Sequence, residues 1–238
     1  ARVFSVFGMV FLLCGMVSAD QYRTFTSADG RTMEAELSDF SSDGTISLRL
    51  KNGRSFTGIK PEIFSEEDRQ YIAEWKLDTI VERGYLETKI RRTRDKVGED
   101  DVGAIEEKIY EAGYSIEFDN GSSVTLEDLR VEYAILSWEA QIAGKRSDGE
   151  YTGLVGDVKI TRLPAFEEVK VETRKITLRE TDLASGYYWV GGGNSDSKDR
   201  LKGCWIRVWK GDKLIHEDSM PTGFRKNHKW SELKKKKQ

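Results

Sequence analysis

Three closely spaced turn dipeptides restrict the N-terminal part of this chain to a compact β-meander. Each lies between short runs rich in Thr, Phe, Ile and Leu: Asp29-Gly30, Asp43-Gly44 and Asn52-Gly53. A type I′ hairpin turn needs positive φ angles, which Asn, Asp and Gly tolerate, so such dipeptides between apolar runs predict tight hairpins. Four short strands joined in this way across residues 22–75 favour a small sheet with one buried face.

The polarity of the residues around these turns supports the same interpretation. Met33, Ala35 and Leu37 alternate with polar residues, which is typical of a half-buried strand. A helix is expected after Ser65, because Ser is a good N-cap and three acidic residues follow it at the positive end of the helix dipole. Tyr71 would lie on the apolar side of this helix.

These features together resemble a known module. They are an aromatic-Thr-x-x-x-Gly-Arg motif that begins at Phe25, an alternating strand through Ala35, the Asp-Gly and Asn-Gly hairpins, and the run Ser-Glu-Glu-Asp-Arg-Gln-Tyr-Ile that begins at Ser65. The combination resembles Sla-type homology domain one, a small SH3-like β-barrel first named in a fungal endocytic adaptor. The module also occurs in secreted planctomycete- and verrucomicrobium-type bacterial proteins that have a signal peptide and a second domain.

The resemblance implies a protein-binding role for residues 20–76. In the adaptor, the module captures Asn-Pro-Phe-x-Asp peptides and is associated with cytoskeletal and ubiquitin-linked partners. SH3-like barrels bind peptides in aromatic-lined grooves, so Tyr22, Phe25, Phe56 and Tyr71 are the candidates for such a groove. Membership of the hydrophobic core is the alternative for Phe25 and Phe56.

Residues 1–19 have the pattern of a secretory signal peptide. One Arg precedes a short apolar run, and Val-Ser-Ala leads up to Asp20, so we expect cleavage after Ala19. The mature protein would then be periplasmic or extracellular; a retained membrane anchor is the alternative. Cys14 lies in the cleaved segment, which leaves Cys204 without a disulfide partner. We expect Cys204 to be a small buried hydrophobe rather than a nucleophile.

The charge distribution argues against nucleic acid as a partner. The net charge is −3, but residues 225–238 contain seven basic residues and one Glu and carry +6, so the rest of the mature chain carries −10. An acidic body with a short basic tail lacks the broad basic face of a nucleic-acid binder. We expect the tail to be solvated and disordered; attraction to an anionic envelope polymer or lipid headgroups is the alternative. Residues 91–96 are expected to be the solvated basic end of a strand.

The rest of the chain is a succession of expected strands without a strongly amphipathic helix. An acidic turn is expected at residues 98–103, and the strands are expected at residues 85–97, 105–118, 129–138, 153–163, 169–178, 203–209 and 214–218. This pattern favours an antiparallel immunoglobulin-like β-sandwich. The run Leu-Glu-Asp-Leu-Arg-Val-Glu-Tyr from Leu126 and the run Trp-Ile-Arg-Val-Trp from Trp205 resemble the second domain of the bacterial proteins. The expected organisation is a signal peptide (1–19), an SH3-like module (20–76), a linker or helix end (77–84), a β-sandwich (85–224) and a basic tail (225–238).

Residues that suggest metal or acid–base chemistry are few. His216 and His228 are the only histidines, and neither belongs to a zinc-binding spacing. There is no Gly-x-Ser-x-Gly elbow for a nucleophilic serine, and the paired carboxylates of an acidic chain do not indicate a glycosidase. We therefore expect no cofactor, no metal and no enzymatic activity, with an unrecognised hydrolase as the weakest alternative.

Aromatic residues suggest a second kind of ligand. Tyr187, Tyr188 and Trp189 precede a loop that begins at Gly191 and ends at Asp199. An exposed Tyr or Trp beside a mobile loop can stack on a sugar or anchor a peptide, whereas ordinary packing in the sandwich is the alternative. The loop also hints at calcium, but its sequence lacks the EF-hand spacing, so a hairpin loop is the better interpretation.

The sequence as a whole predicts a mostly β, exported protein without enzymatic activity. The preferred hypothesis is an adaptor or scaffold that recognises a peptide segment or associates with itself, with β-strand addition at an exposed sheet edge as the mechanism. The alternative is a glycan-binding module that uses Tyr187, Tyr188, Trp189 and the loop after them.

Overall fold

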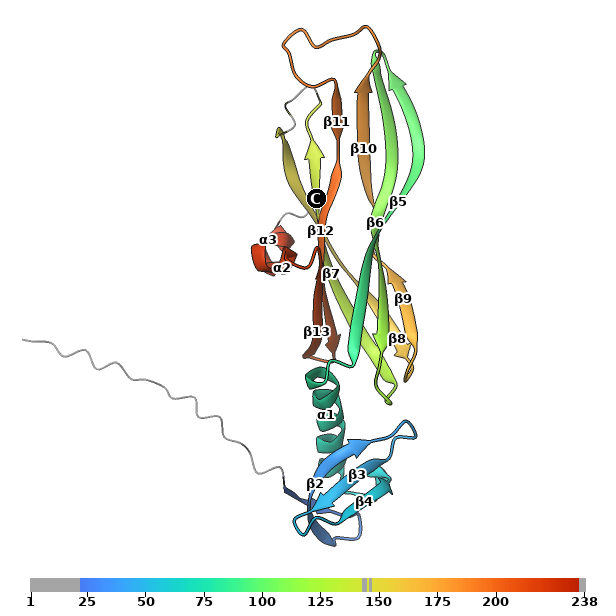
Figure 1. Ribbon diagram of the computed structural model, residues 1–238, viewed down its shortest axis with the longest axis vertical. Coiled ribbons are helices and arrows are strands. Elements are labelled where there is room, and N and C mark those ends of the chain that lie inside the picture. The colour runs from blue at the N-terminus through green and yellow to red at the C-terminus, as the bar shows by residue number, and fades with distance from the viewer. Residues whose placement is uncertain (1–21, 143–144, 146, 236–238) are drawn as a thin grey trace, which may run out of the picture. The chain divides into compact units, whose positions relative to one another are not determined.

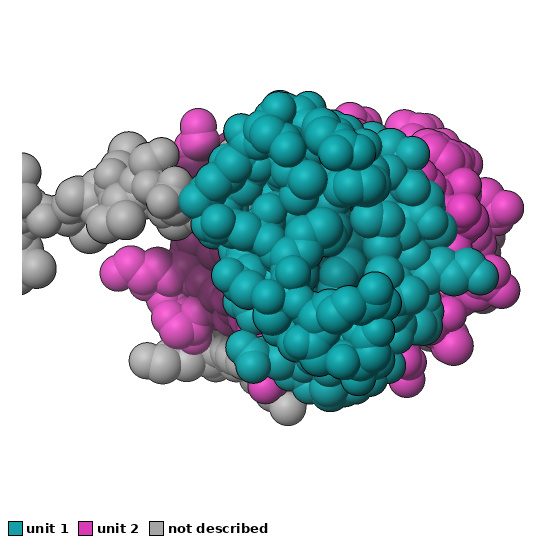
Figure 2. Space-filling model, turned by 90° about the horizontal axis from the view of Figure 1, so that it is seen from below, with its two compact units in different colours: residues 1–40, 45–72 teal, residues 41–44, 73–238 magenta. Residues whose placement is uncertain are grey.

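A computed structural model describes residues 22–142, 145 and 147–235; the predicted signal peptide lies outside these residues. The chain divides into two compact units, which are coloured separately in Figure 2: unit 1 comprises residues 1–40 and 45–72, and unit 2 comprises residues 41–44 and 73–238. The fold is mostly β, and all of its described sheets are antiparallel, as the sequence predicts. In the described part of the chain, no helix has both the length and the apolar character needed to span a bilayer.

Unit 1 contains the predicted meander. Its strands are β1 (Arg23–Thr26), β2 (Thr32–Phe40), β3 (Ile46–Leu50) and β4 (Ser55–Ile59), hydrogen-bonded in that order. The glycines of the three turn dipeptides have φ angles of 83°, 86° and 82°, which confirms the hairpins. The sheet is open, because β1 and β4 are not paired with each other among the described residues. The expectation of a closed barrel is therefore corrected to an open four-stranded sheet.

The core of unit 1 is formed by aromatic and aliphatic side chains from the sheet and from the segment after it. Phe25 is 1% exposed and its ring lies 5.5 Å from that of Phe64. Ala35 and Leu48 are fully buried, in agreement with the alternating pattern. Glu36 departs from this pattern, since its carboxylate is buried and forms an ion pair with Arg49. A buried carboxylate of this kind needs such a partner.

A short 3-10 helix, Pro61–Ile63, precedes the predicted helix, α1 (Glu66–Glu82). The Ser65 hydroxyl accepts a 3.3 Å hydrogen bond from the amide of Asp68, so Ser65 is the N-cap. The Asp68 carboxylate in turn accepts hydrogen bonds from the Thr26 amide, the Ser65 hydroxyl and the Arg23 guanidinium. The start of α1 is thus fixed to β1 by a single buried carboxylate.

Unit 2 contains a β-sandwich (Figure 1). Its strands are β5 (Leu86–Val102), β6 (Ile105–Asn120), β7 (Leu126–Ala140), β8 (Gly149–Leu163), β9 (Glu168–Glu172), β10 (Ile176–Leu183), β11 (Asp196–Lys198), β12 (Arg200–Lys210) and β13 (Lys213–Met220). One sheet has the order β11-β10-β6-β5, with β9 also paired to β6, and the other has the order β13-β12-β7-β8. The chain changes sheet after β6, β8 and β11, which gives the second sheet the G-F-C-C′ order of immunoglobulin-like sandwiches.

The core of the sandwich lies between its two sheets. Tyr114 and Ile116 of β6, Tyr133 and Ile135 of β7, and Cys204 of β12 are all at most 1% exposed. The Tyr133 hydroxyl accepts a 3.0 Å hydrogen bond from the amide of Arg174. Cys204 is a free, buried thiol, in agreement with the expectation for this residue.

Several strands of unit 2 are longer than expected, and two of the sequence-based assignments need correction. Residues 98–102 are not an acidic turn: β5 continues to Val102, and the turn is at Gly103, whose φ is 67°. The long hairpin with β6 provides pairing for this polar segment, which local sequence does not reveal. The strand expected at residues 169–178 is two strands, β9 and β10, that pair with successive parts of β6.

The C-terminal segment is also different from the expected solvated tail. Residues 224–235 form two short helices, α2 (Phe224–Asn227) and α3 (Trp230–Lys235). Phe224 and Leu233 are buried against Ala134 and Leu136 of β7. The expectation of a disordered tail is therefore wrong up to Lys235, because two apolar side chains among the basic residues attach the segment to the outer face of the sheet.

Candidate functional site

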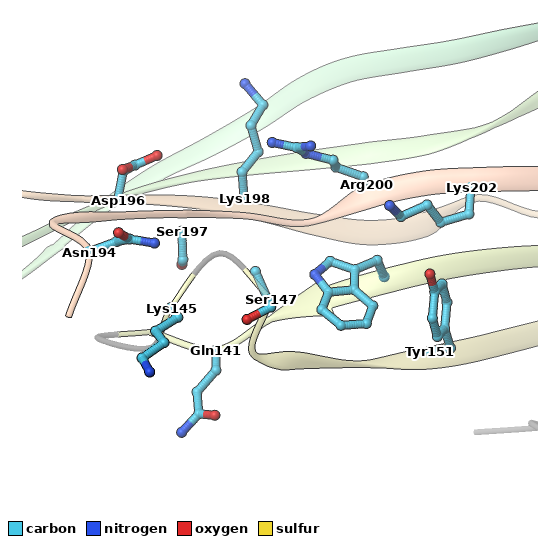
Figure 3. Close-up of a pocket in the computed structure, with 12 residues that line it drawn as sticks. Gln141, Lys145, Ser147, Tyr151, Asn194, Asp196, Ser197, Lys198, Arg200 and Lys202 are labelled. Atoms are coloured by element: carbon cyan, nitrogen blue, oxygen red, sulfur yellow. The ribbon is translucent and has the colours of Figure 1, made fainter.

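The β7–β8 hairpin and the β10–β12 segment enclose a cavity of about 350 Å³ in unit 2 (Figure 3). Its lining is mostly polar: Trp138, Ala140, Gln141, Lys145, Ser147, Tyr151, Asn194, Asp196, Ser197, Lys198, Arg200 and Lys202. In Figure 3, Tyr151 and Ser147 belong to the hairpin, whereas Lys198, Arg200 and Lys202 follow one another along the facing segment. We call this cavity the end pocket.

Strand register places two aromatic side chains in the end pocket. Trp138 of β7 lies directly opposite Tyr151 of β8, and their rings meet edge to face with centroids 4.8 Å apart. A Cβ atom on Gly149 would lie 2.7 Å from the Trp138 ring, so only glycine leaves room for the indole there. Tyr151 is 45% exposed. The pair thus presents a partly exposed aromatic surface at the edge of a polar cavity.

A β-bulge places a cation beside this aromatic pair. Arg200 of β12 lies opposite Trp138, but the register between β12 and β7 shifts between Leu201 and Gly203. Lys202 occupies this irregularity, and its Nζ lies 5.8 Å from the centroid of the Trp138 ring. Bulges commonly redirect a side chain next to a binding site. The bulge therefore helps to combine an aromatic surface with positive charge.

The predicted aromatic run does not line the end pocket, although the loop after it does. Tyr187 and Tyr188 are 63% and 82% exposed, and neither is among the described lining residues. Trp189 has a structural role, because its Nε1 donates a 2.8 Å hydrogen bond to the carbonyl of Asn194 within the loop. The part of the loop that lines the cavity is Asn194, Asp196, Ser197 and Lys198.

Asp199 holds the loop against the sheets. Its carboxylate accepts 2.8 Å hydrogen bonds from the backbone amides of Ala140 and Arg179. Burial raises the pKa of Asp199, although the two amide donors oppose this effect. Asp199 therefore fixes the geometry of the end pocket without needing to contact a ligand.

The four aromatic residues expected to form a peptide groove in unit 1 differ in their burial and in their contacts. Phe25 is a core residue, so its candidacy for the groove is wrong. Tyr71 packs on Phe25 with centroids 6.1 Å apart and is covered by the Arg23 guanidinium at 4.4 Å. Tyr22 is half-buried with Lys51 near its ring, and Phe56 is 39% exposed, which excludes Phe56 from the core.

The two histidines lie against other side chains of the protein, and Cys204 is buried. His216 Nε2 lies 3.1 Å from the Thr88 hydroxyl, which donates to Asp218 at 2.8 Å, so a threonine separates this histidine from the carboxylate. His228 packs against the Phe224 ring. Burial raises the pKa of the Cys204 thiol, which disfavours the nucleophilic thiolate. Among the described residues, no group of three or more His, Cys, Asp and Glu side chains is placed to hold a metal ion.

Sequence reasoning missed Trp138 and Tyr151 as members of a site. Trp138 was expected only at the end of a strand, and Tyr151 lies just before a strand expected to begin at Gly153. Their pairing depends on the register of β7 and β8. The only local signal was the position of Trp138 in its strand. It lies two residues beyond Leu136 and therefore on the face opposite to Tyr133 and Ile135.

Comparison with known proteins gives no identification. No protein-family model and no curated protein matches the chain. Among solved structures, a protein from Akkermansia muciniphila is 14% identical, with a TM-score of 0.23 over 59% of this chain and 74% of that one. The Northeast Structural Genomics Consortium target SoR45 is 11% identical, with a TM-score of 0.23 over 54% of this chain and 90% of that one. Similarity at this level carries no argument about function.

Proposed function

We propose that this chain is an exported binding protein without enzymatic activity, and that its sandwich binds a glycan in the end pocket. The proposal is carried by one observation: the Trp138–Tyr151 pair lies at the edge of a cavity whose other lining side chains are almost all hydrogen-bonding groups. A pyranose has an apolar face and a rim of hydroxyls, so it needs both kinds of contact.

The composition of the end pocket favours binding over hydrolysis. A glycosidase typically uses two carboxyl groups on either side of the scissile bond. Among the described residues that line the end pocket, Asp196 is the single carboxylate, and the others are amides, hydroxyls, cations and aromatic rings. These groups hold a polar ligand but do not supply an acid–base pair.

The experiment that tests this function is a glycan array probed with the full chain and with its Trp138→Ala variant. We expect the wild-type chain to retain one class of oligosaccharide and the variant to lose it, because the indole provides the surface on which the sugar rests. Tyr188→Ala is the matched control, since Tyr188 is an exposed aromatic residue outside the pocket. An array without any retained glycan, or retention that Trp138→Ala leaves unchanged, rejects the proposal.

Peptide binding by unit 1 is a second candidate, in line with the resemblance to the Sla-type module. The observation that favours it is the edge strand β4, which pairs only with β3 among the described strands and is exposed from Ser55 to Gly58. An edge of this kind accepts an added peptide strand. The test is capture of envelope proteins by the full chain, with Thr57→Pro expected to abolish capture and Trp138→Ala expected to preserve it; the reverse result rejects this candidate.

Export belongs to the same proposal and rests on the sequence pattern of residues 1–19. We expect mass spectrometry of the protein from producing cells to show a chain that begins at Asp20. A chain that retains residues 1–19 in the membrane fraction would instead favour the anchor.

A further inference from the structure

Unit 2 has a second cavity, of about 550 Å³, on an open side of the sandwich. β13 pairs with β12 only between Cys204 and Lys210, so the first residues of β12 have no partner on that side among the described strands. β5 is the edge strand of the other sheet. Residues of both strands line the cavity, which we call the side cleft.

The side cleft has an apolar floor and cationic walls. Ala112, Leu178 and Leu201 are at most 8% exposed and lie at its base. Its rim carries basic side chains from β5, from β12 and from the end of β11: Arg92, Arg94, Lys198, Arg200 and Lys202. A concave surface with one sign of charge concentrates ions of the opposite sign.

Three of these cations are not neutralised by a carboxylate. Arg94 and Lys198 share Glu180 as their partner. Arg92, Arg200 and Lys202, by contrast, form no ion pair with any described residue. Six basic residues on the described strands have no ion pair with a described residue, and three of these six line this cleft.

The side cleft and the end pocket share a wall. Lys198, Arg200 and Lys202 line both cavities, and Lys202 also lies beside the Trp138 ring. Counted together, the two linings contain six basic residues and two acidic ones, Asp196 and Asp199, in a chain whose acidic residues outnumber its basic ones, 41 to 38. Asp196, Asp199 and the Glu180 carboxylate that pairs with Arg94 and Lys198 are three acidic groups against six basic ones, so the combined lining keeps an excess of positive charge.

We propose that the ligand is an acidic glycan, with a sugar ring on the Trp138–Tyr151 pair and its carboxylate or sulfate groups in the side cleft. This inference rests on the proposed glycan-binding function and adds the class of sugar. Guanidinium groups bind carboxylates and sulfates through paired, charge-assisted hydrogen bonds, which suits Arg92 and Arg200. The acidic body of the protein opposes a long polyanion such as duplex nucleic acid, so the favoured ligand is a short acidic segment.

The test measures binding of the full chain to oligosaccharides in matched acidic and neutral forms. The probes are oligogalacturonates beside their methyl esters, and sulfated glycosaminoglycan fragments beside their desulfated forms. We expect the acidic member of a pair to bind about tenfold more tightly than the neutral one, and the preference to fall as salt screens the charges. The double variant Arg92→Gln/Arg200→Gln should remove the preference, and Trp138→Ala should weaken both forms.

Arg162→Gln is the matched control, because Arg162 is an exposed arginine of β8 that lines neither cavity and forms no ion pair with a described residue. Neutral and acidic forms that bind equally well, both dependent on Trp138, would overturn the acidic inference and leave the glycan-binding function intact. Failure of every glycan would instead reject the function itself. Tighter binding of single-stranded oligonucleotides that depends on Arg92 and Arg200 but not on Trp138 would overturn the inference in favour of nucleic acid.

Discussion

The carboxylate of Asp199 accepts a 2.8 Å hydrogen bond from the backbone amide of Ala140, which joins the start of β12 to the end of β7. Its other oxygen accepts a hydrogen bond from the amide of Arg179 on β10, in the opposite sheet. One side chain thus connects both sheets at the edge of the end pocket. We expect Asp199→Ala to lower the free energy of unfolding by about 2 kcal/mol, because two backbone donors lose their acceptor.

Chemical denaturation measures this change, and Asp199→Asn is the control. The asparagine keeps one acceptor oxygen, so it should lose less stability than alanine. Asp199→Ala with the stability of the wild-type chain would show that the carboxylate does not connect the sheets.

Asp68 gives unit 1 a stability that depends on pH. Burial disfavours its charged form, but hydrogen bonds from the Thr26 amide, the Ser65 hydroxyl and the Arg23 guanidinium outweigh this effect and lower the pKa of Asp68. A lowered pKa in the folded state contributes stability above the unfolded value, which is about 4, and this contribution is lost as the pH falls through the folded pKa. We expect Asp68→Asn to cost about 2 kcal/mol at neutral pH.

The measurement is urea unfolding of wild type and Asp68→Asn between neutral and strongly acidic pH. The difference between the two proteins should shrink as the pH falls. A difference that stays constant across this range would contradict the role of the ionised carboxylate. Glu66→Gln is the control, because the Glu66 side chain is 70% exposed at the same end of α1.

The parts of the fold that sequence predicted are those that depend on local conformation. Gly30, Gly44 and Gly53 adopt the positive φ angles that their turn dipeptides predicted, and Ser65 caps the helix as expected. The prediction of a turn at residues 98–102 was wrong, because a polar, acidic run is locally typical of a turn. Its pairing with β6 is a tertiary interaction, which overrides local preference.

The candidate site was less accessible to sequence reasoning for the same reason. The loop from Gly191 to Asp199 was identified by its composition, and four of its side chains do line the end pocket. Trp138 and Tyr151 meet through the register of the β7–β8 hairpin, and Arg200 joins them from β12, which is far away in the sequence. Since one extra residue at the Lys202 bulge changes this register, no local pattern could have placed these side chains together.

Gly203 packs closely against Phe224, the first residue of the C-terminal helices. A Cβ atom built on Gly203 would lie 2.2 Å from the Phe224 ring. We expect Gly203→Ala to displace Phe224 and to destabilise the chain by about 2 kcal/mol through overpacking. Thermal unfolding measures the stability, and trypsin cleavage after Arg225 and Lys226 reports the release of the helices.

Gly223→Ala is the control for this prediction, because Gly223 has open space around its Cβ position and an ordinary φ of −80°. This variant should unfold and resist trypsin like the wild type. Equal behaviour of the two variants would contradict the packing of Phe224 on Gly203.

Cys204 should be unreactive in the folded protein. The residue is fully buried, and burial raises the pKa of its thiol, so little thiolate is present or accessible. We expect a Cys14→Ser chain, in which Cys204 is the remaining thiol, to resist a thiol reagent in buffer and to react fully in denaturant. Rapid labelling without denaturant would require β12 to open on the time scale of the reaction.

His216 makes a second pH-dependent contribution to stability. In His216 burial favours the uncharged form, whereas in Asp68 hydrogen bonds favour the charged form. Burial lowers the pKa of His216, and the charge of Arg225 adds to this effect, whereas Asp218 opposes it. The unfolded chain therefore binds a proton at a higher pH than the folded chain does. Between the folded pKa and the ordinary value of about 6.5, stability is lost as the pH falls.

We expect His216→Gln to flatten this part of the stability profile, as measured by urea unfolding from mildly alkaline to mildly acidic pH. His228→Gln is the control at the other histidine, and an unchanged slope in His216→Gln would assign the pH dependence to other groups.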